Sequence, residues 1–138
     1  MIKFSHDNFL MFSEGALREW LLDLAKREGF QIRHMEYNFV DAHKMLSLNQ
    51  EYLNHDTHTD IITFDYSTNK QIEAEVYISQ PALLENAELN TQTPEKEALR
   101  LLSHALLHCV GYNDKSDEDK LVMRSKEEEY MNLFHVKH

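Results

Sequence analysis

The segment from Thr93 to Gly111 carries helix signals at both of its ends, and it constrains the fold more than any other part of this chain. Thr93 can cap a helix and Pro94 suits its first turn. Glu95 and Glu97 follow near the positive end of the helix dipole, where acidic side chains are stabilising. Gly111 permits the left-handed turn that stops a helix. The sequence therefore predicts a single helix through EKEALRLLSHALLHCV.

Helical and strand-like periods alternate along the rest of the chain. Strands are predicted at 2–5, 31–40, 60–66 and 73–79, where β-prone and alternating apolar residues gather. Further helices are predicted from a Ser13 cap to Glu28, at 42–53, in a short stretch that opens at Pro81, and after a Ser116 cap. This interleaved order predicts an α+β fold. Residues 1–138 are expected to form a single domain, with one small mixed sheet packed with helices.

Composition excludes several classes of function. The formal net charge of -10 argues against a general nucleic-acid coat and against a polybasic membrane binder. Three glycines leave no glycine-rich phosphate loop, and one cysteine leaves no internal disulfide and fits a reducing compartment. No apolar run reaches the length of a membrane span or of a signal-peptide core, so we expect a cytoplasmic protein with no membrane partner.

His104 and His108 lie four residues apart on the predicted helix, so both rings leave the same helix face. Two imidazoles in this arrangement can bind one divalent ion at about 2.0–2.1 Å. Asp114 follows the Gly111 turn and can return to the ion as a third ligand. Three protein ligands leave one position open for a water molecule, whose pKa the ion lowers to near neutrality. With nine histidines the pair alone is weak evidence, but its combination with Gly111 and Asp114 is specific.

The same spacing occurs in the metzincin proteases, whose motif is H-E-x-x-H-x-x-G-x-x-H. The glutamate that acts as general base in those enzymes corresponds to Ala105 here, which counts against peptidase chemistry. Two histidines and a carboxylate are also the ligand set of non-haem iron oxygenases. Neither alternative is excluded by the spacing alone.

The stretch HALLHCVGYND, residues 104–114, resembles the motif of the YbeY family of bacterial rRNA maturation factors, which are metal-dependent, single-strand-specific endoribonucleases. Residues 48–52 (LNQEY) and 59–64 (TDIITF) resemble the L-N-x-x-Y segment and the T-D-V-L-S-F strand of that family. Residues 75–79 (EVYIS) resemble its D-I-x-I-S strand. These blocks follow one another in the order of the family and cover most of residues 48–114.

The resemblance implies a zinc-dependent hydrolase domain that cuts single-stranded RNA. One zinc per chain would be held by His104, His108 and Asp114 in a cleft between the motif helix and the sheet, although a two-nitrogen, one-oxygen site also suits nickel, iron or manganese. It further implies a role in rRNA maturation and ribosome biogenesis, namely processing of the 3′ end of small-subunit rRNA, with the ribosome or ribosomal proteins as partners. A non-catalytic ribosome-assembly factor braced by the metal is the alternative, and no residue is identified as a general base.

Two positions depart from the family pattern. Asp114 stands where the third ligand is usually histidine, and Leu53 stands where the family has an arginine after the L-N-x-x-Y tyrosine. The missing arginine leaves open what holds the scissile phosphate. The candidates for substrate binding are Arg100, one turn before His104, Lys115, beside the third ligand, and His58 and Asp60, near the start of the 60–66 strand. The acidic residues 127–129 are expected to lie on a solvated helix end.

Overall fold

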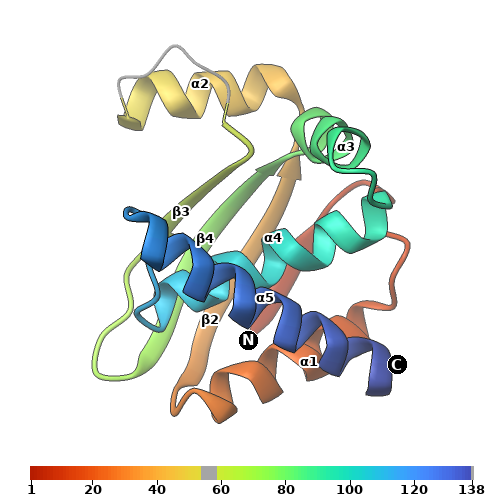
Figure 1. Cartoon of the computed structure of the whole chain (residues 1–138). Helices are drawn as coiled ribbons and strands as arrows, with labels where there is room; N and C mark the ends of the chain where they lie inside the picture. Colours follow the sequence, from red (N-terminus) through yellow and green to blue (C-terminus); the bar gives the residue numbers. More distant parts are fainter. Residues whose placement is uncertain (54–58, 138) are drawn as a thin grey trace.

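The sheet of this protein is mixed and has the strand order β1-β2-β4-β3 in the computed structural model, which describes residues 1–53 and 59–137 (Figure 1). The strands span Ile2–Ser5 (β1), Gln31–Val40 (β2), Ile61–Asp65 (β3) and Gln71–Ser79 (β4). β1 and β4 each pair in parallel with β2, whereas β3 pairs antiparallel with β4. The predicted α+β fold with one small mixed sheet is therefore confirmed.

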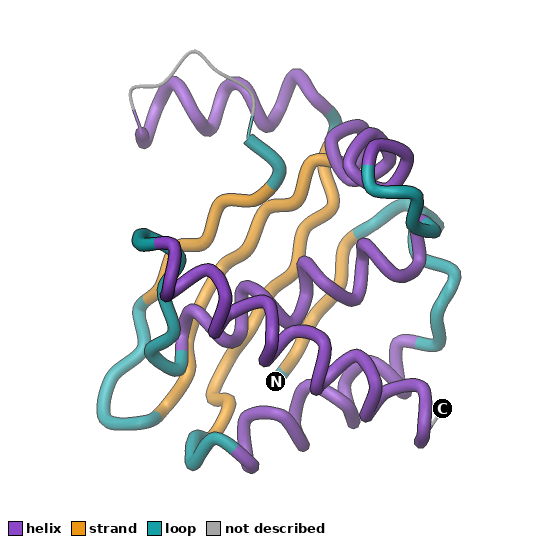
Figure 2. Tube along the Cα trace, in the orientation of Figure 1, coloured by secondary structure: helices purple, strands orange, loops and turns teal. Residues whose placement is uncertain are grey.

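Helices cover one face of the sheet and one end of it (Figure 2). They span Glu14–Arg27 (α1), Ala42–Leu53 (α2), Gln80–Leu89 (α3), Pro94–Cys109 (α4) and Asp117–Lys137 (α5). In Figures 1 and 2, α1, α4 and α5 lie in front of the sheet, and α2 and α3 lie at its upper end. Met45 and Leu48 of α2 pack with Ile62 of β3 in a small separate cluster. In the described part of the chain, no helix is both long and apolar enough to cross a membrane.

The main core lies between the sheet and the helices in front of it. Alternate residues of β4 are buried, as expected of a strand with one face against a core: Ile72, Ala74, Val76 and Ile78. Trp20 of α1 donates a hydrogen bond from Nε1 to the backbone carbonyl of Tyr130 in α5, at 2.7 Å. Tyr37 of β2 donates from Oη to the carbonyl of Leu102 in α4, at 2.8 Å. These bonds fix α4 and α5 on the rest of the core.

The caps of α4 confirm the predicted limits of this helix. Oγ1 of Thr93 accepts a hydrogen bond from the backbone N–H of Lys96 at 3.1 Å, and Pro94 occupies the first turn. Val110 is the C-cap, and Gly111 follows with a φ of +111°. Because glycine adopts a left-handed backbone without steric cost, the chain can leave the helix sharply at this point. Residue 114 consequently returns toward the helix that it has just left.

The strands predicted at 60–66 and 73–79 form a hairpin as β3 and β4, but the second strand begins earlier than predicted. β4 begins at Gln71, two residues earlier than the predicted 73–79 strand. Asn69 and Lys70 form the turn with φ values of 50° and 63°. Two successive left-handed residues match the twist of a two-residue hairpin, but lysine is an uncommon choice at such a position. The TNKQ segment at 68–71 therefore indicated the turn, but not that the second strand begins directly after it.

Candidate metal centre

A pocket of about 380 Å³ opens between α4 and β3, and we call it the histidine pocket. Its polar lining comes from α4 (Arg100, His104 and His108), from β3 and the chain entering it (Thr63, and Thr59 and Asp60), and from the loop after α4 (Asp114). Most of α4 is buried, so packing against the core sets the direction in which its two histidines point. The three proposed metal ligands thus line one pocket between the motif helix and the sheet.

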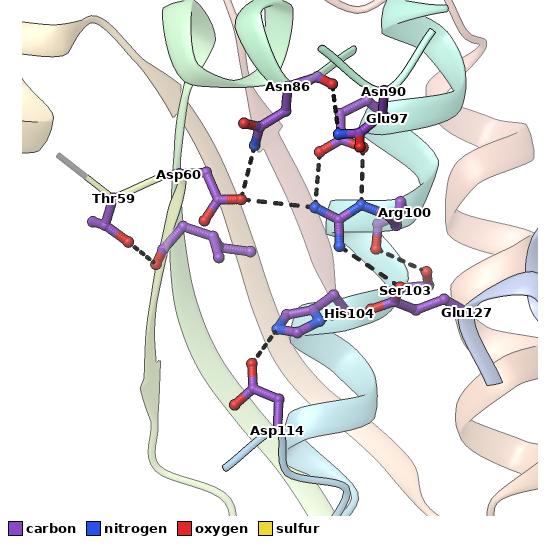
Figure 3. A network of polar contacts seen from close by, with 11 residues as sticks. Thr59, Asp60, Asn86, Asn90, Glu97, Arg100, Ser103, His104, Asp114 and Glu127 are labelled. Atoms are coloured by element: carbon purple, nitrogen blue, oxygen red, sulfur yellow. Dashed lines mark hydrogen bonds and ion pairs between the residues drawn. The ribbon is translucent and has the colours of Figure 1, made fainter. Parts of the chain in front are cut away.

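His104 is held by a carboxylate from a distant part of the chain (Figure 3). Its Nδ1 lies 2.7 Å from Oε2 of Glu127, which belongs to α5. A carboxylate accepts hydrogen bonds, so in the neutral imidazole Nδ1 carries the ring proton and the other nitrogen, Nε2, keeps its lone pair. Carboxylates orient metal-binding histidines in this way in many metalloproteins.

Asp114 faces the free nitrogen of His104. Its Oδ2 lies 3.6 Å from Nε2 of His104 (Figure 3). Two ligands bonded to one tetrahedral ion at about 2.0–2.1 Å lie about 3.4 Å apart. This pair therefore already has close to the spacing of two ligands of a single ion. The Asp114 side chain is 52% exposed, so the pocket is open to solvent on this side.

His108 lines the same pocket one helical turn beyond His104 and is exposed. Within residues 1–53 and 59–137, no three His, Cys, Asp or Glu side chains are close enough together to enclose an ion as they stand. The donor set still fits a divalent ion, because it combines two imidazoles with one carboxylate and because Glu127 leaves His104 with its lone pair toward the pocket.

Arg100 is not a free cation. Its Nε and Nη2 donate hydrogen bonds to the two carboxylate oxygens of Glu97, both at 2.8 Å. Its Nη1 lies 3.6 Å from Glu127, and its Nη2 lies 3.7 Å from Asp60. The hydrogen bonds with Glu97 raise the pKa of Arg100 above its ordinary value. Arg100 thus compensates two buried carboxylates, those of Glu97 and Glu127, at the wall of the pocket.

Of the other three candidates for substrate binding, only one is a described residue that lines the histidine pocket. Asp60 lines the histidine pocket, and its Oδ2 accepts a hydrogen bond from Nδ2 of Asn86 at 3.0 Å (Figure 3). Lys115 is exposed and does not line this pocket. His58 lies outside the residues that the structure describes.

Glu127 was not anticipated as part of the site. The expectation that residues 127–129 are solvated is wrong for Glu127, whose side chain is only 4% exposed. It lies on the buried stripe of α5, between Met123 and Tyr130. A carboxylate at helical spacing within an apolar stripe needs a buried hydrogen-bonding partner, and this is the sequence signal that could have revealed it.

Ala105 is fully buried. The position that carries the glutamate base of the metzincins therefore points into the core here and not into the histidine pocket. The buried alanine offers no general base to a water molecule in the pocket, which counts against a metzincin-type peptidase.

Comparisons with known proteins find one family along nearly the whole chain. A family model described as Endoribonuclease YbeY matches residues 3–135. A protein of Flavobacterium psychrophilum named Endoribonuclease YbeY is 42% identical over 138 residues and is covered, like this chain, over 99% of its length. A protein of the same name from Flavobacterium johnsoniae is 39% identical over 137 residues, again with 99% of each chain covered.

A solved structure has the same fold. The solution structure of TM1509 from Thermotoga maritima aligns with a TM-score of 0.71 at 26% sequence identity. The alignment covers 99% of this chain and 91% of that protein. Both the sheet and the helices that carry the pocket therefore belong to a fold that these proteins share.

Proposed function

This chain belongs to the YbeY family, and on that premise we propose that it is a metal-dependent endoribonuclease, which hydrolyses phosphodiester bonds of single-stranded RNA. The names of its relatives support the reaction class. The observation that carries the proposal for this chain is the state of His104, whose Nδ1 is bonded to a buried carboxylate while its Nε2 faces Asp114. A histidine held in this way is prepared to bind a metal ion.

The proposed metal ligands are His104, His108 and Asp114, and the proposed ion is one zinc per chain. Two imidazoles and a carboxylate are a common ligand set for zinc that takes part in catalysis. Bound there, such an ion would lower the pKa of a water molecule and stabilise negative charge on the phosphoryl oxygens. Nickel, iron and manganese remain alternatives at a site of this composition.

Three further residues support the proposed ligands and the pocket. Oε2 of Glu127 accepts a hydrogen bond from Nδ1–H of His104, which leaves the lone pair on Nε2 directed into the pocket. Arg100 lies 3.6 Å from the buried Glu127 and places a positive charge beside this carboxylate. Asp60 lines the wall formed by the chain entering β3, where its position is set by Asn86. The substrate phosphate would lie between this wall and α4.

The wider role that we propose follows from the family. Members are rRNA maturation factors, so we propose that this chain takes part in ribosome biogenesis in the cytoplasm, by processing the 3′ end of small-subunit rRNA. Docking on the ribosome or on ribosomal proteins would supply binding energy that a chain of net charge -10 lacks for isolated RNA.

Metal content measured by mass spectrometry on untagged protein tests the first step. We expect about one zinc per chain in the wild type and its loss in His108→Ala. The wild type should also cut a labelled single-stranded RNA, and Asp114→Ala should not. Absence of metal from wild-type protein supplied with zinc would refute the proposal. Metal binding without any RNA cleavage would favour an assembly factor in which the ion has a structural role.

A further inference from the structure

A second pocket lies directly beside the histidine pocket, between α3, α4 and α5, and has a volume of about 440 Å³. We call it the amide pocket, because Asn86, Asn90 and Gln92 line it. Arg100 lines both pockets, so one guanidinium group forms part of the wall between them. A chain that crosses the histidine pocket can therefore continue into the amide pocket without leaving the surface.

The amides in this pocket retain hydrogen-bonding capacity. Asn86 uses its Nδ2 to bind Asp60, and Asn90 uses its Nδ2 to bind the backbone carbonyl of Asn86 (Figure 3). The side-chain oxygens of Asn86 and Asn90 accept no hydrogen bond from any residue that the structure describes. Gln92 is exposed at the edge of the pocket. Amide side chains of this kind read the polar edges of unpaired bases.

The same pocket has two available cations. Lys96 of α4 and Arg124 of α5 line it, and both are exposed. Neither of their charged groups is in an ion pair with a described residue. Arg100, in contrast, is engaged by Glu97 through two hydrogen bonds. Among the described residues that line the amide pocket, the cations with free donors are therefore Lys96 and Arg124.

The exposed charges of the amide pocket favour an anion. The described residues that line it carry three cations (Lys96, Arg100 and Arg124) and three carboxylates (Glu97, Glu127 and Glu128), so the lining is formally neutral. Glu97 and Glu127 are buried beside Arg100, so the exposed charges are those of Lys96 and Arg124 and the single carboxylate of Glu128. In a chain of net charge -10, a pocket whose exposed charges are mostly positive is a suitable place for a phosphate group.

We propose that the amide pocket binds the nucleotide next to the scissile phosphate of a single-stranded RNA, with its phosphate on Lys96 and Arg124 and its base against the amides of Asn86, Asn90 and Gln92. This inference rests on the proposed function, since the neighbouring histidine pocket must hold the scissile phosphate. It gives the RNA a path along α4, from the metal ligands past Arg100 to the start of the helix. It also supplies phosphate contacts in a chain that has Leu53 in place of the family arginine.

The test measures binding of this chain to a fluorescein-labelled single-stranded RNA of about 12 nucleotides. Fluorescence anisotropy reports the binding over a range of salt concentrations, and EDTA is present to prevent cleavage. We expect Lys96→Ala/Arg124→Ala to weaken binding about 10-fold near 0.1 M salt. The slope of log Kd against log salt should fall by about 0.7, because the variant loses its contact with one phosphate and each such contact to a single strand contributes about 0.7. Gln92→Leu should weaken binding without a change in slope, since it removes a base contact and no charge.

The matched control is Lys26→Ala/Arg33→Ala. Both residues are exposed, line neither the histidine pocket nor the amide pocket, and carry the same change in charge. The pocket variant is Lys96→Ala/Arg124→Ala. If the control lowers RNA affinity and the salt slope as much as the pocket variant does, binding reflects net charge alone and the inference is wrong. Unchanged binding in the pocket variant would also overturn it.

Cleavage of the same RNA by the zinc-loaded proteins separates this inference from the proposed function. If the wild type cleaves and the pocket variant has an unchanged KM, the amide pocket is not a subsite and the proposed function stands. If the wild type does not cleave at all, the proposed function fails, whatever the binding data show. A raised KM with a nearly unchanged kcat in the pocket variant is the expected result.

Discussion

Nδ1 of His104 lies 2.7 Å from Oε2 of Glu127, although 23 residues separate them in the chain. The carboxylate is almost fully buried on α5, and the imidazole points from α4 toward Asp114. This hydrogen bond makes the orientation of a proposed metal ligand depend on the packing of α5. It therefore connects the stability of the helical layer to the chemistry of the pocket.

Replacement of Glu127 by glutamine should weaken metal binding by about 10- to 100-fold, the usual effect of losing a residue that orients a metal ligand. Glutamine keeps the size of the side chain but removes the charge that favours the Nδ1–H form of His104. The measurement is the zinc dissociation constant from chelator competition. Glu129→Gln, an exposed change on the same helix, is the control and should leave this constant unchanged. Equal affinity of Glu127→Gln and wild type would contradict the orienting role.

The assignment of Asp114 as third ligand can be tested against its acidic neighbour. Asp114→Asn should lower zinc affinity, because a neutral amide is a poorer ligand than a carboxylate. Asp117→Asn should have no such effect, since Asp117 begins α5 and does not line the histidine pocket. Isothermal titration with zinc compares the two variants. A larger loss in Asp117→Asn would move the third ligand to that residue.

Arg100 should be more important for stability than its partly exposed position suggests. Arg100→Met leaves the buried carboxylates of Glu97 and Glu127 without their cation, which we expect to cost about 3 kcal/mol in free energy of unfolding. Urea denaturation measures this change. Arg124→Met is the control for loss of an exposed arginine and should cost less than about 0.5 kcal/mol.

A double variant tests the same pairing independently. If the cost arises from unpaired carboxylates, Glu97→Gln should restore part of the stability lost in Arg100→Met, and the two changes should be non-additive. Additive losses would show that Arg100 acts through packing alone.

The free energy of unfolding should depend on pH in the acid range, because the Glu28 carboxyl titrates there. Burial raises the pKa of Glu28, but hydrogen bonds donated by Tyr130 and Tyr112, with Lys126 nearby, outweigh burial and hold the pKa below its ordinary value. A carboxyl with a lowered folded-state pKa stabilises the fold above its unfolded pKa of about 4.3 and loses that contribution as the pH falls through the folded value.

The corresponding variant is Glu28→Gln. It should be less stable than wild type at neutral pH, and the difference should narrow as the pH is lowered from about 5 toward 3. Urea midpoints across this range provide the measurement. Glu85→Gln, at an exposed position on α3, should follow the wild-type curve. A difference for Glu28→Gln that stays constant with pH would show that its carboxyl does not titrate in the way proposed.

Local signals were sufficient to predict most of the fold. Ser13, Thr93 and Gly111 mark helix ends whose chemistry is contained within a few neighbouring residues, and all three positions act as expected. β2 spans residues 31–40 as predicted, because its alternating pattern is long. β4 begins two residues before its predicted start at residue 73, because Asn69 and Lys70 form a left-handed turn that no glycine marks in the sequence.

Contacts between distant residues were beyond the reach of the sequence. The spacing of His104, His108 and Asp114 is local, so the gathering of all three at one pocket could be expected from it. Glu127 reaches His104 only because α5 packs on α4, and the depth to which it is buried depends on that packing. Arg100 was considered as a free phosphate ligand, although Glu97 precedes it by three residues on the same helix and this pairing could have been expected. Only its approach to Glu127 and Asp60 depends on how α4 is placed against its neighbours.

The most direct test of metal-dependent RNA cleavage is the rate at which chelator-treated protein cuts a labelled single-stranded RNA as zinc is added back. The account predicts no cleavage without metal, cleavage that saturates near one zinc per chain, and none at any zinc concentration in His108→Ala. Cleavage by metal-free protein, or equal rates in wild type and His108→Ala, would contradict it.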